Sequence, residues 1–241
     1  MMAHGCQRTG STWQYNVLIE LGKLWCTQRN FSLNCFTLGK NHHLPQGRLV
    51  AGNCKLFTTC RSLADATLSA VHSPWWWIGF NKTNLETGEI VDSCMKRLHS
   101  NTAEFAYVNP YPLLAVYPVE AVQYHARALD MDINRKEAET IIQTINASFA
   151  TAAELPPDLK LRDNSTGLKK LINKDHRYSH SNTFDSAADK AKLDEMGMLT
   201  DHWCADHYEK LKSGITALSY GSAAPLRRAK RQLINLRGAS G

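Results

Sequence analysis

The stretch GCQRTGSTW, residues 5–13, limits the possible folds of this chain more than any other feature. Gly5 and Gly10 are five residues apart, which is the glycine spacing of a phosphate-binding loop. A helical pattern follows, with its apolar side chains on one face: Trp13, Val17, Leu21 and Leu24. A loop that enters a helix N-terminus directs backbone N–H groups and the helix dipole at one point. The stretch therefore predicts an anion site, with an ordinary tight turn as the alternative.

The side chains of this loop differ from those of a nucleotide triphosphatase. The pattern GxxxxGK[ST] needs a lysine directly after the second glycine, to reach the β- and γ-phosphates. Here that position holds Ser11, and Arg8 lies inside the loop instead. A triphosphate with magnesium fits this loop poorly. A smaller anion, held by Arg8 and the hydroxyl groups of Ser11 and Thr12, fits it better.

A second candidate anion site follows the predicted strand at residues 55–60. Arg61 lies at the carboxyl end of that strand, and Ser69 comes eight residues later in a helical segment. Two helical turns would return Ser69 to the same edge of the sheet, where arginine binds phosphate through two parallel hydrogen bonds. The alternative is that Arg61 pairs with Asp65 and that Ser69 faces solvent.

The order of the elements predicts the fold class. Residues 31–38, 55–60 and 111–118 are typical of strands, and helical segments lie between and after them. This order indicates an α/β fold of three layers, a parallel sheet flanked by helices. We expect one domain over residues 1–241, with its motifs in residues 5–70; residues 155–241 are mostly helical and polar.

Later helices carry recognisable start signals. Pro118 suits the first turn of a helix. Asn134 and Glu137 have the spacing of a capping box at the start of the next amphipathic helix. The tail at residues 227–237 is strongly basic and is read as a solvated terminal helix, with a membrane-binding or partner-binding helix as the alternative.

Three motifs together resemble the sulfotransferases that use 3′-phosphoadenosine-5′-phosphosulfate (PAPS). QRTGSTW, residues 7–13, is similar to their first motif, PKSGTTW. RSLADATLS, residues 61–69, is similar to the second, in which an arginine and a serine keep this spacing. NHHLP, residues 41–45, lies between them and resembles the family's KTHLP. A weaker similarity extends to residue 142.

The resemblance implies a PAPS-dependent sulfotransferase that moves a sulfuryl group to a hydroxyl or amine acceptor and releases 3′,5′-adenosine bisphosphate (PAP). It requires no metal. His43 would be the general base, with His42 as an alternative, and Arg8 would stabilise charge on the leaving oxygen. The implied donor-binding residues are Arg8, Thr9, Gly10, Ser11, Thr12, Trp13, Arg61 and Ser69. The other interpretations are a P-loop small-molecule kinase and a degenerate sulfotransferase homologue that binds nucleotide without catalysis.

Three motifs depart from the family's pattern, and in the second of them Leu63 stands in place of the family's proline. Asn41 stands where relatives have a lysine, and Lys40, one residue earlier, is a possible substitute. The late motif RKGxxGDWK has no clear copy; Lys174 or Arg177 in the basic segment 168–180 could replace it. The tryptophans at 75–77 suit either an acceptor pocket or core packing.

Composition narrows the range of partners and compartments. A net charge of +6 favours an anionic ligand but is too small to predict nucleic-acid binding. We expect a small-molecule or glycan acceptor, no nucleic acid and no integral membrane segment. Seven cysteines without a CxxC pair predict free thiols and a cytoplasmic protein; a Golgi location would need an N-terminal anchor. Histidines and a cysteine at 176, 180, 202, 204 and 207 match no zinc spacing, so we expect no metal.

Overall fold

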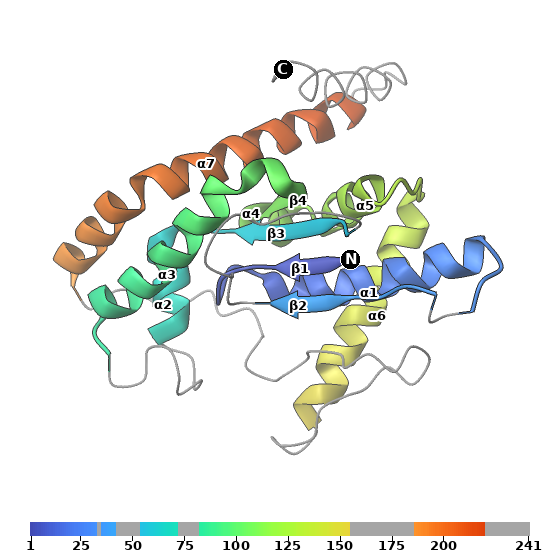
Figure 1. Cartoon of the computed structure of the whole chain (residues 1–241), viewed down its shortest axis with the longest axis horizontal. Helices are drawn as coiled ribbons and strands as arrows, with labels where there is room; N and C mark the ends of the chain where they lie inside the picture. The colour runs from blue at the N-terminus through green and yellow to red at the C-terminus, as the bar shows by residue number, and fades with distance from the viewer. Residues whose placement is uncertain (33–34, 42–53, 72–81, 155–185, 220–241) are drawn as a thin grey trace.

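A four-stranded parallel sheet forms the centre of the molecule (Figure 1). The computed structural model describes residues 1–32, 35–41, 54–71, 82–154 and 186–219. The strands are β1 (Met2–His4), β2 (Gly39–Asn41), β3 (Leu56–Cys60) and β4 (Phe105–Pro110), in the spatial order β2-β1-β3-β4. The helices are α1 (Ser11–Gln28), α2 (Leu63–Val71), α3 (Asn84–Ser100), α4 (Tyr111–Val116), α5 (Pro118–Ala128), α6 (Arg135–Glu154) and α7 (Ala187–Ser219), with a 3-10 turn, η1 (Thr102–Glu104).

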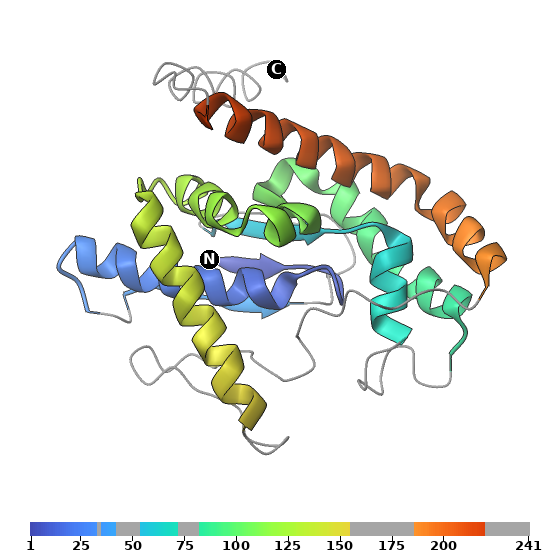
Figure 2. The same ribbon diagram turned by 180° about the vertical axis from the view of Figure 1, so that it is seen from behind.

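Helices cover both faces of the sheet because neighbouring residues of a strand point to opposite faces. Phe57 of β3 packs in the apolar cluster formed with α1, and its neighbour Leu56 packs in the cluster formed with α2, α3 and α7. Figure 1 shows α3 in front of the sheet, and the reverse view of Figure 2 shows α1 and α6 in front of it. The predicted three-layer α/β fold is therefore confirmed.

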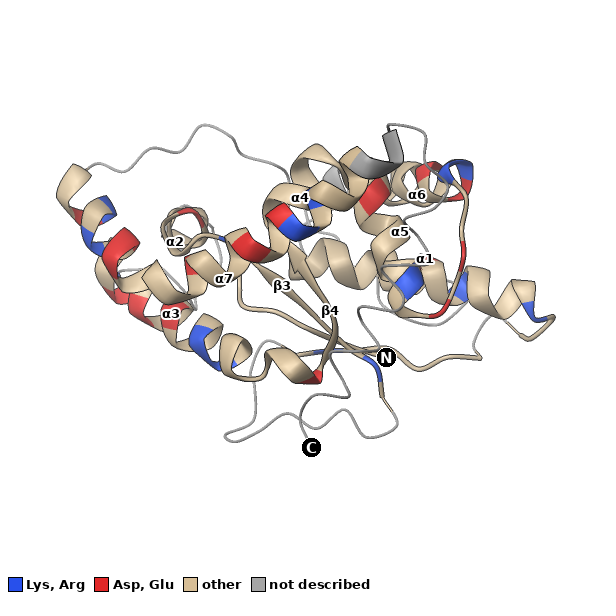
Figure 3. Cartoon of the chain, turned by 90° about the horizontal axis from the view of Figure 1, so that it is seen from above, with Lys and Arg blue, Asp and Glu red and all other residues tan. Residues whose placement is uncertain are grey.

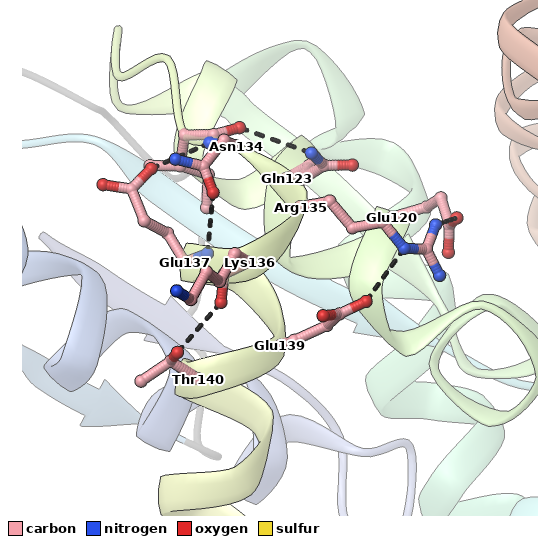
Figure 4. A network of polar contacts seen from close by, with 9 residues as sticks. Glu120, Gln123, Asn134, Arg135, Lys136, Glu137, Glu139 and Thr140 are labelled. Atoms are coloured by element: carbon pink, nitrogen blue, oxygen red, sulfur yellow. Dashed lines mark hydrogen bonds and ion pairs between the residues drawn. The ribbon is translucent and has the colours of Figure 1, made fainter.

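Several predicted elements occur where the sequence placed them. The strand at 55–60 is β3, and the helix after it is α2. Pro118 begins α5. The predicted capping box closes on both sides: Glu137 N–H donates to Asn134 Oδ1 at 2.9 Å, and Asn134 N–H donates to Glu137 Oε2 at 2.8 Å (Figure 4).

Two predicted strands are wrong. Residues 111–116 of the expected strand 111–118 form helix α4, and the strand is instead the preceding segment, β4. Pro110 ends β4 and Pro112 lies in the first turn of α4, a position that suits proline because it needs no N–H donor. The described part of the expected strand 31–38 is irregular, and strand β2 begins only at Gly39.

The expectation of free thiols is also wrong, because three disulfides join six of the seven cysteines. They are Cys6–Cys94, Cys26–Cys35 and Cys60–Cys204, and Cys54 is free. The sequence separations range from 9 to 144 residues, so spacing alone could not reveal the pairs.

None of the described helices is long and apolar enough to cross a membrane.

Candidate functional site

The loop at residues 5–10 lies where the topology of the sheet places ligand sites. The chain leaves β1 through this loop and α1 to reach β2 on one side, and it then crosses to β3 on the other side of β1. All described strands are parallel, so their carboxyl ends share one edge of the sheet. In open α/β sheets, ligands bind outside the carboxyl ends of the strands at such a switch point. Topology and motif therefore indicate the same place.

Two glycines allow the loop its tight path. A Cβ added to Gly5 would lie 2.4 Å from Ser11 Cβ and 2.8 Å from Thr59 Oγ1, which leaves no room for a side chain. Gly10 has φ +94° and begins α1, and a Cβ there would lie 2.8 Å from Leu114 Cδ1. The glycine spacing is thus a steric requirement of this loop.

The two predicted anion motifs contact each other directly. Arg8 Nε donates to Ser69 Oγ at 2.9 Å, and Arg61 Nη1 donates to the carbonyl oxygen of Arg8 at 3.1 Å. Arg8 itself has a positive φ of 64°, a conformation that non-glycine residues rarely adopt. Ser69 therefore lies beside the loop, as the helical spacing predicted. No ion pair joins Arg61 to Asp65, both of which belong to the described residues.

Tyr111 is a component of the site that sequence reasoning missed. The Arg61 guanidinium carbon lies 4.1 Å from the centre of the Tyr111 ring, a cation–π contact that holds the guanidinium plane. A Cβ on Gly10 would also lie 3.0 Å from Tyr111 Cδ2, so the ring covers the loop. The sequence predicted a strand at 111–118, and Tyr111 was therefore not recognised as the first residue of a helix. The two flanking prolines were the available signal for a helix start at this residue.

Lys40 brings a third cation to the start of α1. Its Nζ donates to Thr12 Oγ1 at 2.7 Å, within the first helical turn. The first turn of α1 contains no acidic residue, and no ion pair of Lys40 with a described carboxylate occurs. An ammonium at the positive end of a helix is unfavourable unless an anion lies there. Desolvation lowers the pKa of Lys40 to about 7.

Two other predicted donor-binding residues, Thr9 and Trp13, make contacts with neighbouring elements of the fold. The Thr9 hydroxyl is fully buried, donates to Cys6 O at 2.7 Å and lies 2.7 Å from Thr59 Oγ1, so this side chain ties the loop to β3. The Trp13 ring packs edge-on against the buried His125 of α5, with 6.2 Å between ring centres. Thr9 is therefore buried in the interior, whereas Trp13 is partly buried and packs against α5.

A buried polar group fixes α1 against the sheet. Gln14 Nε2 donates to Thr58 O at 2.9 Å and lies 3.2 Å from His125 Nε2. His125 Nδ1 lies 2.7 Å from Ala121 O, a bond in which it must be the donor, so Nε2 accepts from Gln14. Burial lowers the pKa of His125 to about 4 and keeps it neutral. This network sets the position of the loop that precedes α1.

Several predicted residues lie outside the described part of the chain. They are His42 and His43, the tryptophans at 75–77, Lys174, Arg177 and the basic tail. Cys204, one of the residues considered for zinc, is instead half of a disulfide. Within the described ranges, no group of three or more His, Cys, Asp or Glu residues is arranged to hold a metal ion.

No protein-family model matches this sequence, and no curated protein matches it. Among solved structures, the chain is similar to mouse sulfotransferase SULT7A1, in a crystal structure complexed with PAP. The TM-score is 0.53, the identity is 14%, and the match covers 88% of each chain. At this identity the similarity shows the fold alone: a parallel α/β sheet flanked by helices, like that of the sulfotransferase structure.

Proposed function

We propose that this chain is a PAPS-dependent sulfotransferase that transfers a sulfuryl group to a hydroxyl or amine acceptor, a small molecule or a glycan. The observation that carries the proposal is the contact between the two motifs. Arg8 of the loop hydrogen-bonds to Ser69, and Arg61 hydrogen-bonds to Arg8, at the edge of the sheet where ligands bind. A nucleotide with phosphate groups at both its 3′ and 5′ positions needs two such sites side by side.

The residues present suit this donor. The loop glycines leave space for backbone N–H groups to approach a phosphosulfate, and the α1 dipole favours its charge. Arg61 Nε is buried without a hydrogen-bond partner, although Arg61 Nη1 is bonded. A buried unpaired donor of this kind is costly, and an anionic oxygen would satisfy it. Strands β3 and β4 end in Cys60 and Pro110, so neither ends in a magnesium-binding carboxylate.

In this proposal the residues divide between the two ends of the donor. Arg61 and Ser69 bind the 3′-phosphate, and the N–H groups of Ser11 and Thr12 bind the 5′ end. Arg8 supplies permanent positive charge between them, and Lys40 supplies a cation at Thr12. The donor provides the sulfuryl group. The acceptor oxygen or nitrogen forms the new bond to sulfur, the bond from sulfur to the bridging oxygen breaks, and its electron pair stays on the 5′-phosphate near these cations.

The acceptor's proton must go to a base, and His43 remains our predicted base. Imidazole is suited to this step because its usual pKa lies near neutrality. If His43 has this role, His43→Ala slows transfer but leaves the affinity for PAP unchanged.

Transfer of a labelled sulfuryl group from PAPS tests the proposal. We expect wild-type protein to label at least one member of a panel of hydroxyl and amine acceptors, and Arg8→Ala to lose most of this activity. Arg29→Ala is the matched control, because Arg29 stacks on Trp25 at the far end of α1. Transfer of phosphate from ATP would overturn the proposal in favour of a kinase. Nucleotide binding without any transfer would support the non-catalytic homologue instead.

The disulfides bear on where the reaction takes place. Disulfides persist in oxidising compartments and are rare in the reducing cytoplasm. We therefore place the enzyme in an oxidising compartment. The sequence had led us to expect the cytoplasm instead. Mass spectrometry of the protein isolated from its source with its thiols blocked would show the three pairs; six free thiols would contradict this placement.

A further inference from the structure

One stripe of the long helix α7 holds the turn between β3 and α2. The residues of this stripe, Gly197, Asp201 and Cys204, follow helical spacing and face the same segment of the chain. Cys204 forms a disulfide with Cys60, the last residue of β3. Asp201 Oδ1 accepts a hydrogen bond of 2.8 Å from the backbone N–H of Leu63, the first residue of α2. The segment 60–63 is thus fixed at both ends by α7.

Gly197 allows the two elements to approach closely. A Cβ at this position would lie 2.8 Å from the Cβ of the fully buried Leu63. The α7 helix also packs against α3 and β4, so it forms a stable support for the turn. Figure 1 shows α7 crossing above the sheet, from the side of α2 and α3 toward α5.

The held segment contains Arg61, and the helix that it starts contains Ser69. Arg61 lies between the disulfide at Cys60 and the cap at Leu63. Ser69 is on α2, whose first N–H groups have no partner within the helix and need an acceptor such as Asp201. The α7 residues are more than 130 positions away along the chain, and their hydrogen bond and disulfide both go to the β3–α2 turn.

From these contacts we infer that Asp201 and Cys204 are positioning residues for the 3′-phosphate half of the donor site. They act through the β3–α2 turn, which they hold so that Arg61 and Ser69 both face the loop. This inference rests on the proposed function, which assigns Arg61 and Ser69 to the 3′-phosphate. It adds a specificity role for a helix that the sequence motifs do not reach.

The surroundings of Asp201 raise the pKa of its carboxyl group. Acidic residues gather where α2, α3 and α7 meet (Figure 3). Desolvation, and then the nearby carboxylates Asp194, Asp65 and Asp92, raise the pKa of Asp201 to about 6, against the opposing effect of the Leu63 N–H. The oxygen of an asparagine amide could accept the Leu63 hydrogen bond as the Asp201 carboxylate does, but it would carry no charge. The variant Asp201→Asn therefore separates the hydrogen bond from the charge.

The test compares affinities for PAP and for 5′-AMP, which lacks the 3′-phosphate, at pH 7.5. We expect Asp201→Ala to lower the preference for PAP by about tenfold and to leave the affinity for 5′-AMP unchanged. Asp201→Asn should keep most of the preference, because its amide oxygen still accepts from Leu63 N–H. Asp194→Ala is the control on the same helix, since Asp194 is exposed and pairs with Lys190; it keeps Asp201 ionised at pH 7.5 and should leave the preference for PAP unchanged.

A second pair of variants tests the disulfide contact of the same turn, and all titrations are made at a temperature at which circular dichroism shows each variant to be folded. Cys60→Ser with Cys204→Ser should also lower the preference for PAP, whereas Cys26→Ser with Cys35→Ser should not. The inference is overturned if the wild type prefers PAP and the folded Asp201 and Cys204 variants keep that preference. Equal weakening of both nucleotides would also overturn it. If the wild type shows no preference for PAP, it is the proposed function that fails.

Discussion

At the scale of single residues, the site is defined by cations at one helix N-terminus. Arg8, Arg61 and Lys40 all make hydrogen bonds to groups of the loop, its helix or the neighbouring motif. The two arginines keep their charge at every physiological pH, and Lys40 does not, because desolvation lowers its pKa to about 7. Lys40 is therefore the cation whose contribution to binding should depend on pH.

We predict that the affinity for PAP falls by about tenfold between pH 7 and pH 9, because Lys40 loses its proton over this range. The 5′-phosphate is fully ionised there and does not contribute. The Lys40→Arg variant should keep its affinity at pH 9. His4, on the strand beside Lys40, is buried with a lowered pKa and is neutral throughout this range. An equal pH dependence in Lys40→Arg would contradict the assignment.

The loop backbone gives a second prediction at this scale. Gly10→Ala places a side chain on a residue with φ +94° and against Leu114 Cδ1, so we expect it to lower the free energy of unfolding by about 1–3 kcal/mol. Urea unfolding measures this change. Gly39→Ala is the matched control, because its new Cβ would meet only the flexible end of Met2. A Gly10→Ala protein as stable as Gly39→Ala would show that the loop geometry is wrong.

At the scale of elements, the sequence predicted a helix or its start correctly where the signal lies within a few consecutive residues. Three local features could be predicted: the Asn134–Glu137 cap, the proline at the start of α5 and the Arg61-to-Ser69 spacing. Each depends on positions within one helix or directly beside it. The strand β2 could not, because it has only three residues and depends on pairing with β1. An apolar run such as 111–118 suits a strand or a buried helix equally.

Contacts between residues that are distant in the chain could not be predicted from the sequence either. Nothing local indicates that Thr12 contacts Lys40, or that Asp201 caps α2, 138 residues away. The motif pattern placed Arg8, Arg61 and Ser69 at one edge of the sheet, but the bonds among them depend on how α2 packs. The sequence therefore predicted that Arg8, Arg61 and Ser69 lie close together, but it did not predict the contacts that hold them there; their role in binding stays a prediction.

The capping box gives a prediction for α6. Asn134→Ala removes the acceptor for Glu137 N–H and should lower the free energy of unfolding by about 1 kcal/mol. Arg135→Ala removes exposed ion pairs with Glu120 and Glu139, also visible in Figure 4, and should cost less than about 0.5 kcal/mol. Urea unfolding of the two variants checks this order. If Arg135→Ala were the more destabilising change, the ion pairs and not the cap would hold the start of α6.

At the scale of the whole molecule, disulfides join the helical layers to the sheet. Cys6–Cys94 links the loop to α3, and Cys60–Cys204 links β3 to α7. The third pair, Cys26–Cys35, closes only a short segment at the end of α1. A crosslink that closes a longer loop restricts the unfolded chain more strongly.

We therefore predict different costs for two disulfide removals. Replacing Cys60 and Cys204 with serine should destabilise the protein by roughly 5 kcal/mol, and replacing Cys26 and Cys35 by roughly 2.5 kcal/mol, from the loop lengths of 144 and 9 residues. Thermal unfolding under non-reducing conditions measures both. Equal losses in the two double variants would show that chain entropy is not the main contribution of these crosslinks.

The function we propose requires one edge of this sheet to bind a nucleotide phosphorylated at both its 3′ and 5′ positions. Calorimetric titration of the wild type and of Arg61→Ala with PAP, 5′-AMP and ATP with magnesium tests it most directly. We expect the wild type to bind PAP much more tightly than the other two, and Arg61→Ala to weaken the binding of PAP by about 2–4 kcal/mol while leaving that of 5′-AMP unchanged. Preferential binding of ATP, or equal binding of PAP and 5′-AMP, would contradict it.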